Sequence, residues 1–183
     1  MYTEIEILSE EKAIERVNSI TDKKIAVISI TSPGKTFVLF ESMNPLVIKT
    51  LHLSFFDVDD EEDHFAPVED DFRGIRDFAD FLDKYEAPEN LIVIVHCAYG
   101  ISRSAAVAAA LYLHTKHYKE AYGILRYLYP ADKEVGKCIR DLFPENVNEK
   151  IFENMDIERG TKRTLLPNPL VFWLALSALK HEL

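Results

Sequence analysis

Short apolar runs alternate with longer amphipathic segments through the first half of the chain. Four runs have the length and the β-branched or aromatic content of strands: residues 24–30, 37–40, 47–56 and 91–95. The first run is followed by Ser32-Pro33-Gly34, a combination that is typical of turns. We therefore predict four β-strands, because a short apolar run bounded by turn residues is typical of a buried strand.

Apolar residues at helical spacing mark much of the remaining chain. Ser9, followed by two glutamates, is typical of a helix N-cap with an acidic first turn. Pro67 is expected to begin a second helix, whose apolar stripe runs from Val68 to Tyr85. After residue 103 the pattern predicts helices at 103–117, 119–128, 133–142, 146–155 and 170–181.

This order of strands and helices predicts an α/β fold. We expect a central, mostly parallel sheet flanked by helices on both faces, and a helical C-terminal half. A chain of 183 residues, of which 48% are hydrophobic, suits one well-packed domain, so residues 1–183 are expected to form a single domain. The helix at 170–181 is expected to be a core helix, because a membrane span needs roughly twenty apolar residues.

Composition narrows the range of partners and compartments. The formal net charge of −10 disfavours binding to nucleic acid or to an anionic membrane. Residues 1–6 lack the basic and apolar regions of a signal peptide. Two cysteines, Cys97 and Cys138, fit a reducing cytoplasm better than a disulfide-bonded secreted protein. The oligomeric state is left open, with a monomer as the expectation.

One motif carries most of the chemical information. The apolar run 91–95 is followed directly by His96-Cys97-Ala98-Tyr99-Gly100-Ile101-Ser102-Arg103-Ser104. A thiol has an ordinary pKa of about 8.5, and only the thiolate attacks. The free N–H groups at the start of the next helix would stabilise that negative charge. An inert buried cysteine is the alternative interpretation, but it would need neither a glycine nor an arginine at these positions.

The five residues between Cys97 and Arg103 are enough for the chain to curl around a tetrahedral anion. Their N–H groups would point inward as an anion nest, and Gly100 would allow the curl. Arg103 would then return to the same point with a planar fork that binds two phosphate oxygens. The loop therefore predicts a phosphate-binding site between a strand and the following helix, at the carboxyl end of the sheet.

Residues 97–104 resemble the active-site loop of the cysteine-dependent protein tyrosine phosphatases, Cys-x-x-Gly-x-x-Arg-Ser/Thr, with the customary histidine before it. The compact dual-specificity and bacterial members are similar over about residues 53–118 and at the helix start 166–170. The resemblance implies that Cys97 is the nucleophile and that Arg103 and the amides of residues 98–103 hold the phosphate. It also implies that Ser104 hydrogen-bonds the sulfur as it leaves and that His96 fixes the loop and favours the thiolate.

Cleavage of a phosphate ester also needs an acid that protonates the leaving oxygen, which contributes roughly 10² to 10⁴ in rate. Residues 57–63 contain many carboxylates, although an acidic run after a strand is usually a solvated loop. The resemblance favours Asp57, because the acid of related phosphatases follows an apolar strand end. Asp59, Asp60 and Asp63 remain alternatives.

These inferences predict a phosphoprotein phosphatase that hydrolyses phosphotyrosine, and also phosphoserine or phosphothreonine in a dual-specificity form. The alternatives are a phospho-ligand-binding module without turnover and a phosphatase of phosphoinositides or RNA 5′-phosphates. The loop has no lysine, which disfavours phosphoinositides, and the net charge disfavours RNA. A rhodanese-type sulfurtransferase would not be expected to have Gly-x-x-Arg-Ser after its cysteine.

No metal or cofactor is expected. His114 and His117 are one helical turn apart, but the sequence offers them no third ligand. A basic cluster at residues 159–163 is a candidate for receiving phosphate, and a solvated loop is the equal alternative. Cys138 is interpreted as a plain helix residue, and a redox role for it is the minor alternative.

Overall fold

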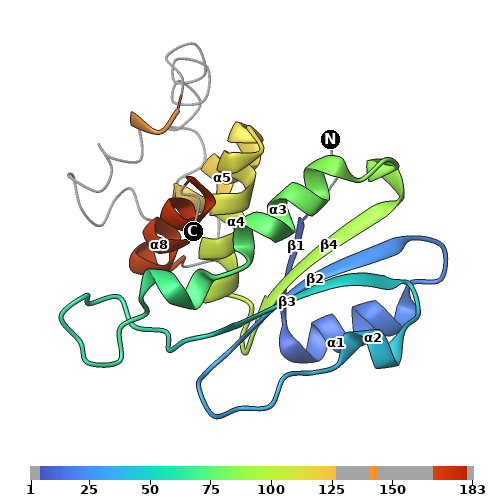
Figure 1. Cartoon of the computed structure of the whole chain (residues 1–183), viewed down its shortest axis with the longest axis horizontal. Helices are drawn as coiled ribbons and strands as arrows, with labels where there is room; N and C mark the ends of the chain where they lie inside the picture. Colours follow the sequence, from blue (N-terminus) through green and yellow to red (C-terminus); the bar gives the residue numbers. More distant parts are fainter. Residues whose placement is uncertain (1–4, 127–140, 144–166, 181–183) are drawn as a thin grey trace, which may run out of the picture.

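Four parallel strands form one sheet in the order β1-β4-β2-β3 in the computed structural model (Figure 1). The structure describes residues 5–126, 141–143 and 167–180. The strands are β1 (Ile5–Ser9), β2 (Lys24–Thr31), β3 (Val47–Ser54) and β4 (Leu91–Cys97). Strand β4 lies inside the sheet and is apolar except at its end, as expected of a strand that is covered on both faces.

Helices cover both faces of this sheet (Figure 1). The helices and 3₁₀ turns are α1 (Glu10–Ser19), α2 (Phe40–Met43), η1 (Glu69–Phe72), α3 (Ile75–Lys84), η2 (Pro88–Asn90), α4 (Arg103–His114), α5 (Tyr118–Leu125) and α8 (Pro169–Lys180). Helices α1 and α2 pack on one face and enclose the smaller core, whereas α3, α4, α5 and α8 contribute to the larger core on the other. The predicted α/β fold with a parallel sheet is thus confirmed.

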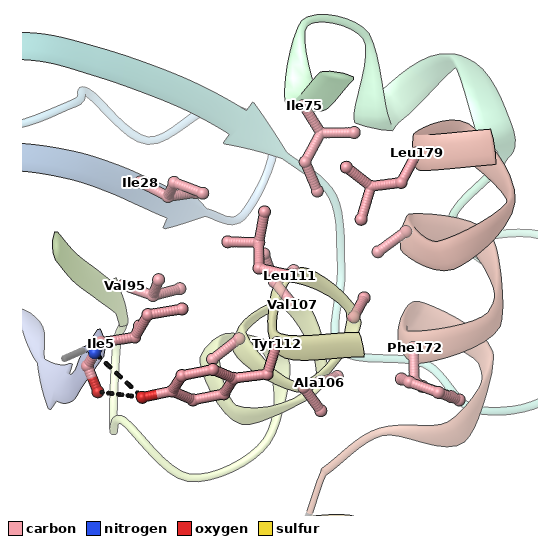
Figure 2. Close-up of a cluster of buried hydrophobic side chains, with 14 of the residues drawn as sticks. Ile5, Ile28, Ile75, Val95, Ala106, Val107, Leu111, Tyr112, Phe172 and Leu179 are labelled. Carbon is pink, nitrogen blue, oxygen red and sulfur yellow. Dashed lines mark hydrogen bonds between the residues drawn. The ribbon is translucent and has the colours of Figure 1, made fainter. Parts of the chain in front are cut away.

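Helix α4 is the centre of the larger core and follows directly from the loop of interest. It lies between the sheet and α8, and every residue from Arg103 to Leu113 is buried (Figure 2). Its alanines allow both neighbours to approach closely. Tyr112 ties α4 to β1, because its hydroxyl accepts from the Ile5 N–H at 2.9 Å and donates to the Ile5 carbonyl at 3.4 Å. This packing holds α4 against the strands.

Several of the predicted elements match the structure. The predicted strands at 24–30, 47–56 and 91–95 correspond to β2, β3 and β4. Ser9 is the N-cap of α1, and its hydroxyl accepts from the Lys12 N–H at 3.3 Å. The C-terminal helix is confirmed as α8, which packs on α4 and α3. Among the described residues, no helix is long and apolar enough to cross a membrane.

Two predictions of secondary structure are wrong, and one strand was missed. Residues 37–40 are not a strand, because Phe40 instead begins α2 and is fully buried against His96. The helix expected from Pro67 is interrupted by Gly74, which has φ +88, so that α3 begins only at Ile75 and Val68 is 57% exposed. The strand β1 was not predicted, because its five residues have only one fully buried side chain.

Helix boundaries downstream also differ from the prediction. Helix α4 ends at His114 rather than at residue 117, because Lys116 has φ +63 and begins a reversal. The N–H groups of Lys116 and His117 bond the carbonyls of Leu113 and Tyr112, which is the Schellman pattern of a helix end. The predicted helices at 133–142 and 146–155, Cys138 and the basic cluster at 159–163 fall wholly or largely outside the described residues.

Candidate active site

The loop between β4 and α4 has a conformation that only glycine permits at its midpoint. Gly100 has φ +69, and a Cβ atom there would lie 2.4 Å from the backbone of Leu8 and Ser9 at the end of β1. The loop backbone therefore packs directly on a neighbouring strand. This contact gives Gly100 a steric role in addition to the conformational one expected from the sequence.

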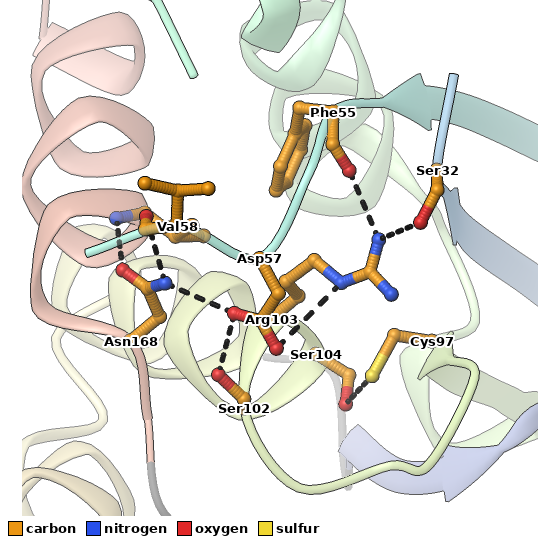
Figure 3. A network of polar contacts seen from close by, with 10 residues as sticks. Ser32, Phe55, Asp57, Val58, Cys97, Ser102, Arg103, Ser104 and Asn168 are labelled. Carbon is orange, nitrogen blue, oxygen red and sulfur yellow. Dashed lines mark hydrogen bonds and ion pairs between the residues drawn. The ribbon is translucent and has the colours of Figure 1, made fainter. Parts of the chain in front are cut away.

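Cys97 lies at the end of β4, at the bottom of this loop. Its side chain is 3% exposed, and its sulfur lies 3.3 Å from the hydroxyl of Ser104 (Figure 3). Burial by itself raises the pKa of the thiol, but hydrogen bonds from the Ser104 hydroxyl and from the N–H groups of Ser104, Gly100 and Tyr99 outweigh it and lower the pKa below its ordinary value. The loop thus favours the thiolate by means of donors rather than by exposure to water.

Arg103, the first residue of α4, reaches back across the loop. Its side chain is nearly buried, and its Nη1 donates to the carbonyl of Phe55 at 2.9 Å and to the Ser32 hydroxyl at 3.3 Å. Its Nε makes no hydrogen bond with any described residue. The opposite nitrogen, Nη2, points toward Cys97 in Figure 3. Two donors of the fork therefore remain for an anion above the sulfur, which suits the bidentate geometry of a phosphate.

Asp57 follows β3 and lies beside Arg103 and Ser102 of the loop (Figure 3). One of its oxygens, Oδ1, accepts hydrogen bonds from Ser102 Oγ at 2.8 Å and from Asn168 Nδ2 at 2.9 Å (Figure 3). The other, Oδ2, lies 3.9 Å from Arg103 Nε. Within the described part of the chain, Asp57 is the one of the four candidate acids that contacts the loop. Asp60 and Asp63 instead accept from nearby N–H groups within their own exposed turns.

Asp59 is exposed. The remaining predicted residues of the loop differ in exposure. Tyr99 is 82% exposed and Ile101 is 40% exposed, so both form part of the rim. Ala98 is also exposed, whereas Ser102 is half-buried and bonded to Asp57. The loop interior is therefore built from backbone, with the side chains directed outward.

His96 lies next to Cys97 but on the opposite face of the sheet. Its ring is fully buried and packs edge-on against Phe40, with ring centroids 5.2 Å apart. Burial, and then the charge of His52, lower its pKa to about 4, while the carbonyl of Cys97 opposes both effects. Apart from this contact with the Cys97 carbonyl, neither ring nitrogen has a hydrogen-bonding partner in the described part of the chain. The neutral ring is thus part of the core beneath β4, and its expected role in fixing the loop stays a prediction.

Sequence reasoning missed three groups that complete the site. Ser32 and the Phe55 carbonyl hold the guanidinium, and Asn168 holds the carboxylate. Ser32 had been noted only as a turn residue and Asn168 only as part of a helix start. The Asn-Pro pair at 168–169 was the available signal, because it is typical of an N-cap followed by the first helical residue. Within the described ranges no group of three metal-ligating side chains exists.

Comparison with known proteins gives one family match and several distant structural resemblances. The sequence profile of the dual specificity phosphatase catalytic domain matches residues 10–148. No curated protein matches the chain. Solved structures that resemble it include PTPMT1 in complex with PI(5)P, with 16% identity, a TM-score of 0.48, and coverage of 95% of this chain and 87% of that chain. Tk-PTP in the active form has 13% identity, a TM-score of 0.42, and coverage of 84% and 90%.

A parallel α/β sheet with a cysteine-and-arginine loop at the end of an inner strand defines the class of cysteine-based phosphatases. The profile match covers most of the chain and includes this loop. The protein belongs to the dual specificity phosphatase catalytic domain family.

Proposed function

We propose that this protein is a phosphoprotein phosphatase that hydrolyses phosphotyrosine, and also phosphoserine or phosphothreonine, through a cysteinyl-phosphate intermediate. The observation that carries the proposal is the convergence of three groups at the carboxyl end of β4. The Cys97 thiol, whose pKa is lowered, and the Arg103 guanidinium belong to the same loop, and Asp57 lies 3.9 Å from Arg103 and is hydrogen-bonded to Ser102 of that loop. A bound phosphate there would contact all three groups.

In the first step the Cys97 thiolate attacks phosphorus and the ester P–O bond breaks. Arg103 and the N–H groups of residues 98–103 hold the three equatorial oxygens, where negative charge must be stabilised in the transition state. Protonated Asp57 gives its proton to the leaving oxygen, which departs as a phenol or an alcohol. The enzyme now carries phosphate on sulfur, and Asp57 is a carboxylate.

In the second step water attacks the phosphorus of the intermediate. Asp57 takes a proton from this water, the S–P bond breaks, and inorganic phosphate leaves. The Ser104 hydroxyl, 3.3 Å from the sulfur, donates a hydrogen bond to the thiolate as it is released. The site then returns to its starting protonation state.

The apolar rim of the site supports phosphotyrosine as the substrate. Tyr99 and Ile101 are exposed on the loop, and Phe56 lies beside Asp57 with its ring 5.3 Å from that of Phe65. A flat aryl ring would bury apolar area against such a rim. The acidic residues 57–63 and the absence of lysine from the loop argue against phosphoinositides on an anionic membrane and against RNA. We further propose that the protein acts as a monomer in the cytoplasm, where a catalytic thiol stays reduced.

A trapping experiment tests the covalent mechanism. The wild type should hydrolyse p-nitrophenyl phosphate, be inhibited by vanadate and retain ³²P after an acid quench. Cys97→Ser should abolish turnover and labelling, because a serine hydroxyl is far less ionised than this thiol. Cys138→Ser, the same change at the other cysteine, is the matched control and should keep both. Turnover by Cys97→Ser would overturn the mechanism.

Substrate class needs a separate measurement. Phosphate release would be compared for a phosphotyrosine peptide, the same peptide with phosphoserine or phosphothreonine, a phosphoinositide and an RNA 5′-phosphate. We expect the highest kcat/KM for phosphotyrosine. A clear preference for the lipid or the RNA would overturn the protein-substrate proposal while leaving the chemistry intact. Phosphopeptide binding without any turnover would instead support a binding module.

A further inference from the structure

Asn168 is buried between the segment that follows β3, which carries Asp57, and the start of helix α8. It is the residue before Pro169, which begins α8, and its side-chain Oδ1 accepts from the Val171 N–H at 3.0 Å. Its own carbonyl accepts from the Phe172 N–H. Asn168 is thus the N-cap of α8, and the residue as a whole is only 5% exposed.

The capping bond fixes the orientation of the Asn168 amide. Because the Val171 N–H is a donor, the atom that faces it must be the amide oxygen, and the NH₂ group must face the other way. There it donates to the carbonyl of Val58 at 3.0 Å and to Asp57 Oδ1 at 2.9 Å. Two acceptors on one side and a backbone donor on the other leave no alternative to this orientation.

This orientation decides which oxygen of Asp57 can carry a proton. Oδ1 already accepts from Asn168 Nδ2, a group that can only donate, and also from Ser102 Oγ. A proton on Oδ1 would face the amide hydrogens. Oδ2 makes neither of these bonds and lies on the side of Arg103, whose Nε is 3.9 Å away. Oδ2 is therefore the oxygen that is free to exchange a proton with a bound phosphate ester.

We propose that Asn168 is a positioning residue that directs Oδ2 of Asp57 toward the leaving oxygen of the substrate. By bonding Val58 as well, it anchors the backbone after Asp57 to the start of α8. This inference rests on the proposed function, because it assumes that Asp57 is the acid. It makes the N-terminus of a helix 111 residues further along the chain part of the acid-base machinery.

Asn168→Ser separates the positioning role from the capping role. Serine is an equally good N-cap, but its side chain is too short to reach Asp57. We expect kcat/KM for phenyl phosphate to fall about tenfold, since a misplaced acid loses part of its contribution to the rate. For 2,4-dinitrophenyl phosphate, whose leaving group needs little protonation, we expect less than about a twofold change. An equal loss for both substrates would overturn the proposal.

Asn44→Ser is the matched control for a loss of stability. Asn44 is also a buried asparagine whose Nδ2 donates to two carbonyls, those of Val17 and Ile20, and whose Oδ1 accepts from the Leu46 N–H. It lies among α1, α2 and β3, away from the loop. Its replacement should lower the unfolding midpoint without changing the ratio of the two rates. If it changed that ratio as much as Asn168→Ser does, Asn168 would have no special role.

Asp57→Asn completes the test. It separates the assumption that Asp57 is the acid from the assumption that the enzyme uses a covalent mechanism. By itself it should reduce the phenyl phosphate rate selectively, and Asn168→Ser added to it should then cause no further selective loss, because both act through one carboxyl. If wild type is active but Asp57→Asn is not selective, the positioning inference fails and the covalent mechanism stands. If Asn168→Ser fails to fold, Asn168→Asp retains the cap, presents an acceptor to Asp57 and should cause the same selective loss.

Discussion

Cys97 and His96 are adjacent on β4, and their side chains lie on opposite faces of the sheet in very different surroundings. Both side chains are almost completely buried. The pKa of each is lowered, but with opposite results, since a lowered pKa favours the charged form of the thiol and the neutral form of the imidazole. Burial disfavours charge on both.

The difference between the two faces is the supply of hydrogen-bonding partners that stabilise charge: donors for the thiolate of Cys97, and acceptors for a protonated His96. On the loop side, backbone N–H groups and the Ser104 hydroxyl surround the sulfur and overcome the cost of burial. On the other face, the described residues offer the ring nitrogens of His96 only the carbonyl of Cys97, and burial outweighs its effect. A strand end thus becomes a nucleophile site only on the face where the chain curls back over it. Three predictions test this comparison.

Gly100→Ala should have the largest effect, because it disrupts the curl itself. The added Cβ would meet the backbone of Leu8 and Ser9 at 2.4 Å, so the loop or β1 must move. A shift of about 1 Å at a reacting group costs on the order of 10² in rate, and we expect kcat/KM to fall by at least that factor. Aryl phosphate hydrolysis and vanadate affinity would both report the loss.

Gly34→Ala is the matched control for Gly100→Ala. Gly34 also has a positive φ, +83, but a Cβ there would meet nothing within 4 Å. It therefore carries the backbone strain of about 1–2 kcal/mol without the collision. Similar losses of activity in the two variants would mean that strain, rather than the contact with β1, explains the result.

Ser104→Ala should have an intermediate and pH-dependent effect. Removing the side-chain donor raises the pKa of Cys97, so less thiolate is present at any pH below that pKa. The acidic limb of the kcat/KM profile should move to higher pH, with about a tenfold loss at the acid end and a smaller loss at neutral pH. Slower release of the sulfur should also increase the ³²P-labelled fraction at steady state.

Ser29→Ala is the control for Ser104→Ala. Ser29 is a fully buried serine on β2, and its hydroxyl has no hydrogen-bonding partner within the described ranges. It is paired in register with His96 rather than with Cys97. If Ser29→Ala moved the acidic limb as far as Ser104→Ala does, the limb would not report the thiol.

Of the three replacements, that of His96 should change activity least and the pH dependence of stability most. Its pKa is about 4 in the folded protein and 6.5 in the unfolded chain, so the unfolded chain binds a proton first as the pH falls. Stability should be lost between pH 6.5 and about 4, by up to about 3 kcal/mol. Urea unfolding of wild type and His96→Gln over this range measures the effect. Equal slopes for the two proteins would contradict it.

Local patterns predicted those parts of the fold that local interactions govern. Strands β2 and β4 are predominantly apolar runs, and Ser9 caps α1 through its own hydroxyl, so both signals lie within a few residues. Residues 37–40 have equally strong β propensity, but Phe40 is placed by packing on His96, more than fifty positions away. Propensity is a weak guide where tertiary packing competes with it.

The choice of the general acid shows the same limit of prediction from local sequence. The sequence placed four aspartates between residues 57 and 63 and offered no local reason to separate them, and only the resemblance favoured Asp57. The structure brings Asp57 to Arg103 because β3 and β4 are parallel and end at the same edge of the sheet. Asn168 was not identified, because its contact with Asp57 spans 111 residues.

The sequence by itself determined the nucleophile loop, because its key residues lie within eight positions. The chemistry and spacing of Cys97, Gly100, Arg103 and Ser104 can be interpreted without knowing which other segments pack against them. Tertiary structure alone decided what lies opposite that loop. Strand order placed Ser32, Phe55 and Asp57 around Arg103, and the packing of α8 on α4 brought Asn168 to Asp57. These contacts join segments far apart in the chain, and their positions depend on the packed core rather than on any local pattern.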